Sequence, residues 1–144
     1  MNKTLPDKWV RKALHDLLND MVVDGHTIKC YDSRVTGSSK PKFYILLTTQ
    51  ENSEKDYNKC EKQWLSSILI DIVTIYPGRG NTGSRLLADN ILDRVRSLTH
   101  DFNLDAASGL RIHDIKQRFP NDISTSTPNQ NIFRKFLRLE LEIN

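Results

Sequence analysis

The C-terminal segment from Phe133 to Ile143 constrains the fold most strongly, because apolar and charged side chains alternate along it. The apolar positions are Phe133, Leu137, Leu139, Leu141 and Ile143, and the intervening charged ones are Arg134, Arg138, Glu140 and Glu142. Phe136 is the exception on the charged side. A period of two is typical of a β-strand with one buried face. The chain is therefore expected to contain a sheet whose opposite face is either solvated or covered by a partner.

Two other segments have the periodicity of amphipathic helices. The first starts at Thr4-Leu5-Pro6-Asp7, with Thr4 as a hydroxyl cap, and is expected to end near Asp24-Gly25. Its apolar stripe is Val10, Ala13, Leu14, Leu17, Leu18 and Met21. The second helix is expected to start at a cap formed by Thr82 or Ser84. Its stripe is Leu86, Leu87, Ile91, Leu92, Val95 and Leu98.

The remaining strands are predicted at 26–31, 43–49, 62–76 and 110–119, with an irregularity near Ile115. Segments rich in Ser, Gly, Asn and Pro predict long loops at 32–42, 77–83 and 120–131, and residues 50–57 are predicted to form a further polar loop. The order is α-β-β-β-α-β-β. It predicts an α+β two-layer sandwich, with a mostly antiparallel sheet and both helices packed on one face. At 144 residues the chain is expected to form one domain over 1–144.

Composition narrows the functional class. The formal charge is only +3 and charges of both signs are interleaved, so a dedicated nucleic-acid binder is disfavoured. No apolar run is long enough to cross a bilayer, and no hydrophobic signal segment opens the chain, so we expect a cytoplasmic protein or one in a particle assembled there. Cys30 and Cys60 are too few for a disulfide framework and are expected to be free thiols.

Residues 78–83 match G-x-G-x-x-G, which in a dinucleotide-binding fold lets the backbone approach a pyrophosphate. The preceding strand is neither the first element nor a short apolar one, so this reading is disfavoured. The four histidines are scattered and no CxxC occurs, so neither a metal nor a cofactor is expected. No catalytic machinery is recognisable, and we expect no enzyme activity.

Asp71 is unusual because it stands within the apolar run of the 62–76 strand. Burying an unpaired carboxylate is expensive, so Asp71 is expected to be solvated on an open face or paired. Both readings fit a sheet face that meets another subunit.

The arrangement of these segments resembles the phage tail-terminator family, also called tail-completion or neck proteins. The likeness is carried by the N-terminal helix, the strand Phe43-Tyr44-Ile45-Leu46-Leu47, and the strand Trp64 to Val73 with its Ile70-Asp71-Ile72 pattern. It continues through the helix 86–96, the segment 109–112 and the C-terminal strand. The loops 32–42, 78–83 and 120–131 exceed what a minimal member needs.

The resemblance implies a structural virion protein that forms a closed hexameric or dodecameric ring at the neck or the head-proximal end of the tail. Its partners would be other copies of the chain and the adjacent portal, connector and tail proteins, with DNA passing through the lumen without sequence specificity. The candidate subunit-interface residues are Asp71, Arg79, Arg85, Arg134, Arg138 and Glu140. Two alternatives stay open: a nucleotide- or ligand-binding module using the Gly78–Gly83 loop, and a bacterial adaptor domain that binds one partner.

Overall fold

A computed structural model describes residues 4–35, 41–56, 62–78 and 83–144 of the chain. Its helices are α1 (Asp7–Leu18) and α2 (Leu86–Thr99), with a 3-10 turn η1 (Ala106–Ser108). Its strands are β1 (Met21–Val23), β2 (His26–Asp32), β3 (Phe43–Asp56), β4 (Lys62–Pro77), β5 (Ile112–Arg118), β6 (Ile123–Ser126) and β7 (Gln130–Ile143).

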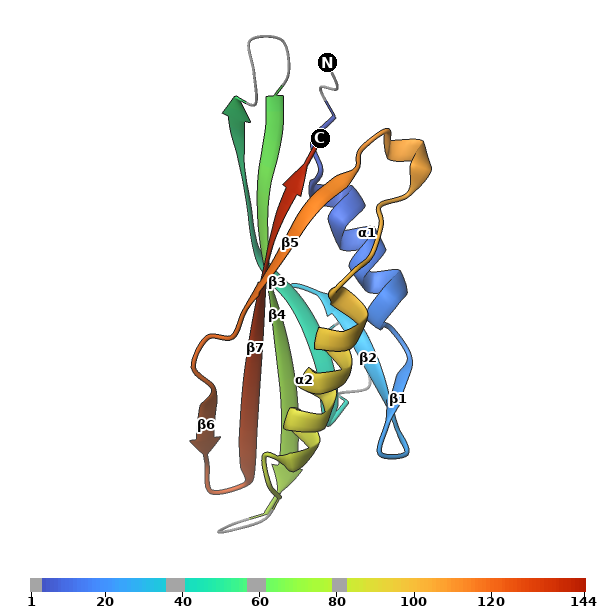
Figure 1. Ribbon diagram of the computed structural model, residues 1–144. Coiled ribbons are helices and arrows are strands. Elements are labelled where there is room, and N and C mark those ends of the chain that lie inside the picture. The colour runs from blue at the N-terminus through green and yellow to red at the C-terminus, as the bar shows by residue number, and fades with distance from the viewer. Residues whose placement is uncertain (1–3, 36–40, 57–61, 79–82) are drawn as a thin grey trace.

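The strands form one seven-stranded sheet in the order β1-β2-β3-β4-β7-β5, with β6 also paired to β7. Every neighbouring pair is antiparallel except β2 and β3, which run parallel. Both helices lie on the same side of the sheet (Figure 1). The predicted two-layer α+β sandwich is therefore confirmed.

The core lies between the helices and one face of the sheet. The helices contribute Val10, Leu14 and Leu18 from α1 and Leu87, Ala88, Ile91 and Val95 from α2, all buried. The central strands contribute Ile68, Ile70 and Ile72 from β4 and Leu137, Leu139 and Leu141 from β7. Each fully buried side chain of this size stabilises the fold by about 2 kcal/mol. The alternation predicted for β4 and β7 is what directs these residues to one face.

The first helix is shorter than expected. Pro6, and not Thr4, is its N-cap residue, and Val10 donates a backbone hydrogen bond to the Pro6 carbonyl. The helix ends at Leu18, and Met21 belongs to β1, which pairs with β2. Asp24 and Gly25 have φ of 50° and 79°. Two positive φ values in sequence fit the tight hairpin turn that joins β1 to β2, so this dipeptide closes a hairpin instead of ending a helix.

The start of α2 also differs in detail. Arg85 is its N-cap residue, while the Ser84 hydroxyl accepts a hydrogen bond from the Leu86 N–H at 3.3 Å. Thr82, the other expected cap, lies outside the described residues. Leu86 is 65% exposed and not part of the buried stripe.

Two of the expected loops contain strand. β3 continues to Asp56, so the loop predicted at 50–57 is wrong through Asp56. A register shift between Thr48 and Glu51 allows the strand to continue beyond its apolar part. Similarly, β6 and the start of β7 lie within the loop predicted at 120–131. In both segments backbone pairing with a long neighbour supplies the order that apolar alternation does not. The irregularity expected near Ile115 occurs between Ile112 and Asp114.

The sheet has two ends of different width. β1, β2 and β6 pair only with the lower end in Figure 1, whereas β3, β4, β7 and β5 continue upward as four strands. We call this upper part the four-strand end; it comprises Glu51–Asp56 of β3, the β4 residues from Lys62 to Leu69, the β7 residues from Arg138 to Ile143, and β5.

Candidate functional site

The face of the sheet opposite the helices, called the outer face below, gathers four of the six predicted interface residues. Asp71 projects from β4, and Arg134, Arg138 and Glu140 project from β7, in the alternate positions to the core residues. Neither α1 nor α2 covers this face (Figure 1). The clustering follows from strand register alone, because residues two apart on a strand share a face.

Asp71 and Arg134 are two oppositely charged residues near the centre of this face. Asp71 is only 6% exposed, and its strand partners are Leu46 on β3 and Phe136 on β7. The Oδ1 of Asp71 and the Nε of Arg134 are both buried, and neither atom has a hydrogen-bond partner among the residues that the structure describes. Burial raises the pKa of the Asp71 carboxyl, and the positive charge of Arg134 partly opposes that rise.

An acceptor and a donor of opposite charge are therefore buried near each other without hydrogen bonds at these atoms. Such groups cost free energy until something pairs with them. The neighbouring outer-face residue Val73 is also fully buried. The centre of the outer face thus has the apolar and unsatisfied polar character of a contact surface rather than of a solvated one.

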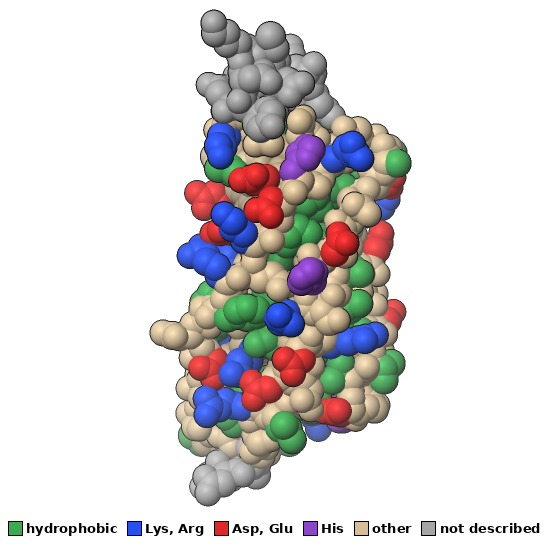
Figure 2. Space-filling model, in the orientation of Figure 1, with side chains coloured by type: hydrophobic (Ala, Val, Ile, Leu, Met, Phe, Trp, Pro, Cys, Tyr) green, Lys and Arg blue, Asp and Glu red, His purple; other side chains and the backbone are tan. Residues whose placement is uncertain are grey.

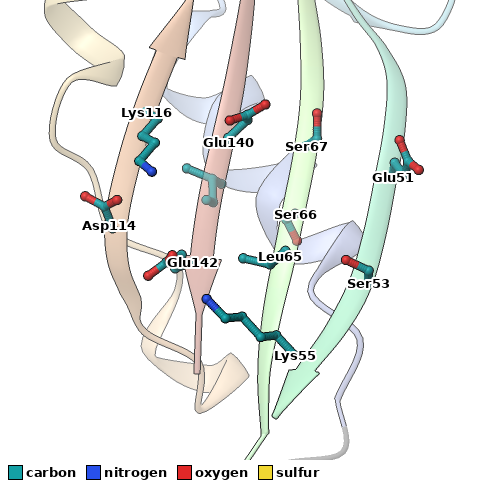
Figure 3. A pocket seen from close by; sticks show the side chains of 11 residues that line it. Glu51, Ser53, Lys55, Leu65, Ser66, Ser67, Asp114, Lys116, Glu140 and Glu142 are labelled. Atoms are coloured by element: carbon teal, nitrogen blue, oxygen red, sulfur yellow. The ribbon is translucent and has the colours of Figure 1, made fainter. Parts of the chain in front are cut away.

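The four-strand end of the outer face contains a shallow pocket of about 380 Å³. Figure 3 shows its side chains projecting from all four strands. It is lined by the carboxylates Glu51, Asp114, Glu140 and Glu142, by Lys55 and Lys116, and by Ser53, Leu65, Ser66, Ser67 and Leu141. Carboxylates outnumber lysines by four to two, so the pocket favours a cationic or mixed-charge partner.

Two interactions position the charged groups around this pocket. Arg118 of β5 pairs with Glu140 of β7 at 2.5 Å. Arg138 donates a hydrogen bond of 2.7 Å to the hydroxyl of Ser67 on β4. Both couplings join neighbouring strands within one chain, and the Arg118 side chain is still 63% exposed.

Arg85 lies away from the outer face, at the start of α2. It pairs with Asp122 at 2.8 Å, and Lys135 bridges Asp122 and Asp89 at 3.4 and 2.9 Å. The Arg85 hydrogen bond, followed by that of Lys135, holds the pKa of Asp122 below its usual range. The network joins α2 to β7. Arg85 therefore has a structural role within the subunit, as a partner of Asp122. Arg79 lies outside the described residues.

The Gly78–Gly83 segment has a packing reason for its last glycine. A Cβ on Gly83 would lie 2.2 Å from ring atoms of Tyr76, and its φ is 78°. The β4 strand before it is antiparallel to both neighbours. A dinucleotide-binding glycine loop follows a parallel strand, so the geometry does not support the nucleotide reading. Residues 79–82 lie outside the described residues.

Within the described part of the chain, no three His, Cys, Asp or Glu side chains are grouped as metal ligands would be. Cys30 is buried as a free thiol, and burial raises its pKa to about 12. Cys60 lies outside the described residues. No helix of the described chain is long and apolar enough to cross a membrane. Figure 2 shows Lys, Arg, Asp and Glu side chains intermingled over the helical side, without a field of one sign.

The sequence did not reveal most of the pocket. The sequence predicts a loop for Glu51, Ser53 and Lys55 because the segment lacks apolar alternation, and Asp114 and Lys116 lie on a short strand with a bulge. The one available signal was the length of β4, which requires partners along its whole extent.

These features define the chain as a two-layer α+β protein whose uncovered sheet face carries a charged pocket. No family model matches the chain, and no curated protein matches it either. Among solved structures, the chain is similar to one in "Virion of native gene transfer agent (GTA) particle", at 12% identity and a TM-score of 0.62. The match covers 94% of this chain and 96% of that one, so the two share their fold over nearly their whole length.

Proposed function

We propose that this protein is a structural component of a phage-like virion. In this proposal its copies form a closed ring, hexameric or dodecameric, at the neck or at the head-proximal end of the tail. The ring joins portal or connector proteins to the tail, and DNA passes through its lumen. The protein acts by assembly and not by catalysis.

The whole-chain fold likeness supports the particle role. The similar chain comes from a structure described as a virion, and the match leaves almost no part of either chain uncovered. Sequence identity of 12% carries no residue-level correspondence. The finer assignment to a neck ring therefore rests on the order of elements that resembles tail-terminator proteins.

The observation that carries the assembly role is that two buried polar atoms on the outer face, Asp71 Oδ1 and Arg134 Nε, lack hydrogen-bond partners among the described residues. A single chain in water gains nothing from burying an acceptor and a donor without partners. An assembly partner whose contact shifts these side chains, so that Asp71 Oδ1 gains a donor and Arg134 Nε an acceptor, would recover this free energy. Asp71, Arg134, Arg138 and Glu140 are accordingly the proposed interface residues, together with Arg85 at the start of α2 and with Arg79, which lies outside the described residues.

Arg138 offers the cleaner test of this interface. Reversing Arg134 would place a second carboxylate beside buried Asp71 and destabilise the subunit itself. Arg138→Glu instead loses one hydrogen bond to Ser67 and changes the charge of the outer face by two. We expect the variant to fold and to assemble less tightly, as measured by light scattering over a concentration series. Arg94→Glu, at an exposed position on α2, is the matched control and should assemble normally.

An Arg138→Glu protein that assembles like the wild type would remove the outer face from the interface. A variant that loses its circular-dichroism signal would show a folding role for Arg138, and would contradict this assignment too.

A further inference from the structure

The four-strand end leaves two strand edges without a strand partner in the described chain. β2 pairs with β3 only between Tyr44 and Leu47, so no described strand lies beside the distal part of β3 that carries Glu51, Ser53 and Lys55. β5 is the last strand of the sheet order, and its other edge is also unpaired. Unpaired strand edges are templates for strand addition by another chain.

The two edges run in opposite directions within one chain. β3 is antiparallel to β4, β4 to β7, and β7 to β5, so β5 is antiparallel to β3. Rotation about an axis along the strands keeps every strand direction. A neighbour generated by that rotation therefore brings its β3 edge antiparallel to β5, with both outer faces on the same side.

The charges along these edges select one register. With Ser53 opposite Lys116, Glu51 lies opposite Arg118 and Lys55 lies opposite Asp114. All of these except Arg118 line the outer-face pocket, and Arg118 contacts Glu140 there. Moving the register by two residues one way would place Lys55 opposite Lys116, which is unfavourable. Moving it the other way would leave one complementary pair, Glu51 with Lys116, in place of two.

Arg118 suits a position between two subunits. Its guanidinium has several donors, so it can hold Glu140 of its own chain and a second carboxylate at once. Glu51 of a neighbouring copy would be that second carboxylate. The result is a row of alternating charge that continues from one sheet to the next.

We propose that β5 of one copy adds antiparallel to the distal edge of β3 of the next copy, forming a sheet that continues around the ring. The occupant of each edge is thus a second copy of this chain. This inference rests on the proposed ring and specifies how its subunits join. The contact is heterologous, because different strands form its two sides. Repeating it around the axis leaves no free edge only when the ring is complete.

The test is disulfide trapping in the full-length chain. Ser53→Cys and Lys116→Cys are combined in a Cys60→Ser background, since both positions are exposed and directly opposite in the proposed register. Buried Cys30, with its raised pKa, stays unreactive. Under mild oxidation we expect a ladder of cross-linked species that ends at the ring size, and reduction should return the monomer.

Single variants and a displaced pair serve as controls. Ser53→Cys alone and Lys116→Cys alone should not cross-link. In the proposed contact β3 of one copy meets β5 of the next, so a single variant never brings two introduced cysteines together. Efficient dimers from either single variant would show a two-fold contact and overturn the proposal. Ser53→Cys combined with Arg96→Cys, on the exposed side of α2, should also remain monomeric on a denaturing gel.

Charge exchange supplies an independent readout. Arg118→Glu should raise the concentration needed for assembly about fivefold per contact, and adding Glu51→Arg should restore it, since exposed cross-strand charge pairs have effects of this size. If the wild-type chain forms a closed ring while the Cys pair fails to cross-link, edge pairing is wrong and the ring role stands. If neither a ring nor cross-links form, both proposals fall.

Discussion

At the scale of single residues, Asp71 is the most informative side chain. Its pKa is raised, chiefly by burial, so around its native pKa the folded chain binds more protons than the unfolded chain. The free energy of unfolding of the monomer therefore falls as the pH rises through the window between the ordinary value of 3.8 and the raised one. Above that window the full cost of the buried charge is present.

Asp71→Asn should accordingly stabilise the isolated subunit, by about 1 kcal/mol at pH 7, since it removes a buried charge. The gain should shrink as the pH falls through the same window. Urea unfolding at several pH values measures both effects. If assembly weakens in the same variant, the charge serves the interface; a variant with unchanged assembly and lower subunit stability would contradict this account.

Lys135 is the residue that ties α2 to the sheet. Its ammonium bridges Asp89 and Asp122, its side chain is only 21% exposed, and the Asp89 hydrogen bond is the main cause of its raised pKa. Lys135→Ala should lower the free energy of unfolding by about 1 kcal/mol, because it leaves two solvent-accessible carboxylates without their shared cation. Arg85→Ala, which removes one exposed partner of Asp122, should cost about 0.5 kcal/mol or less. Equal losses in thermal or urea unfolding would refute the bridging role.

At the scale of elements, the bulge in β3 separates its apolar part from its polar part. Thr49 has a φ of 46°, a left-handed conformation that a β-branched side chain adopts at a cost of about 1–2 kcal/mol. The bulge shifts the register so that Glu51 lies opposite Ser67. The distal half of β3 can then continue as an edge beyond β2.

Replacing Thr49 with glycine should therefore stabilise the chain, by about 0.5 kcal/mol after the entropy cost of glycine is subtracted. Thr48→Gly, one residue earlier in regular strand, should instead destabilise it by about 1 kcal/mol. Changes of opposite sign in the free energy of unfolding of the two variants, measured by urea titration, would support strain at Thr49. Equal destabilisation by both would show that Thr49 is not strained.

Elements with a strong apolar period were predictable, and those that depend on their neighbours were not. The patterns in α2, β4 and β7 identified their buried faces, because burial on one side requires that spacing. The distal half of β3 and all of β6 have no such pattern, since their order comes from hydrogen bonds to β4 and β7. The alternation in β4 and β7 also predicts one shared face for Asp71, Arg134, Arg138 and Glu140. The pocket beside them could not be foreseen, because it needs the distal half of β3.

At the scale of the whole molecule, one side of the sheet encloses the core and the other carries the proposed assembly surface. The helices and the inner face enclose the core, while the outer face combines a buried, unsatisfied centre with a charged four-strand end. The strands β3 and β5 flank that end, and no further described strand lies beside them there. A closed ring satisfies both edges of every copy at once, and it leaves the centre of each outer face available to the adjacent virion proteins of the proposal.

The most direct test of the ring is the mass of the purified chain in solution, measured by light scattering over a concentration series. The account predicts a discrete assembly of six or twelve copies of the 16.6 kDa chain, with no larger species as concentration rises. Open-ended growth or a strict monomer at the highest concentration would contradict a self-closing ring.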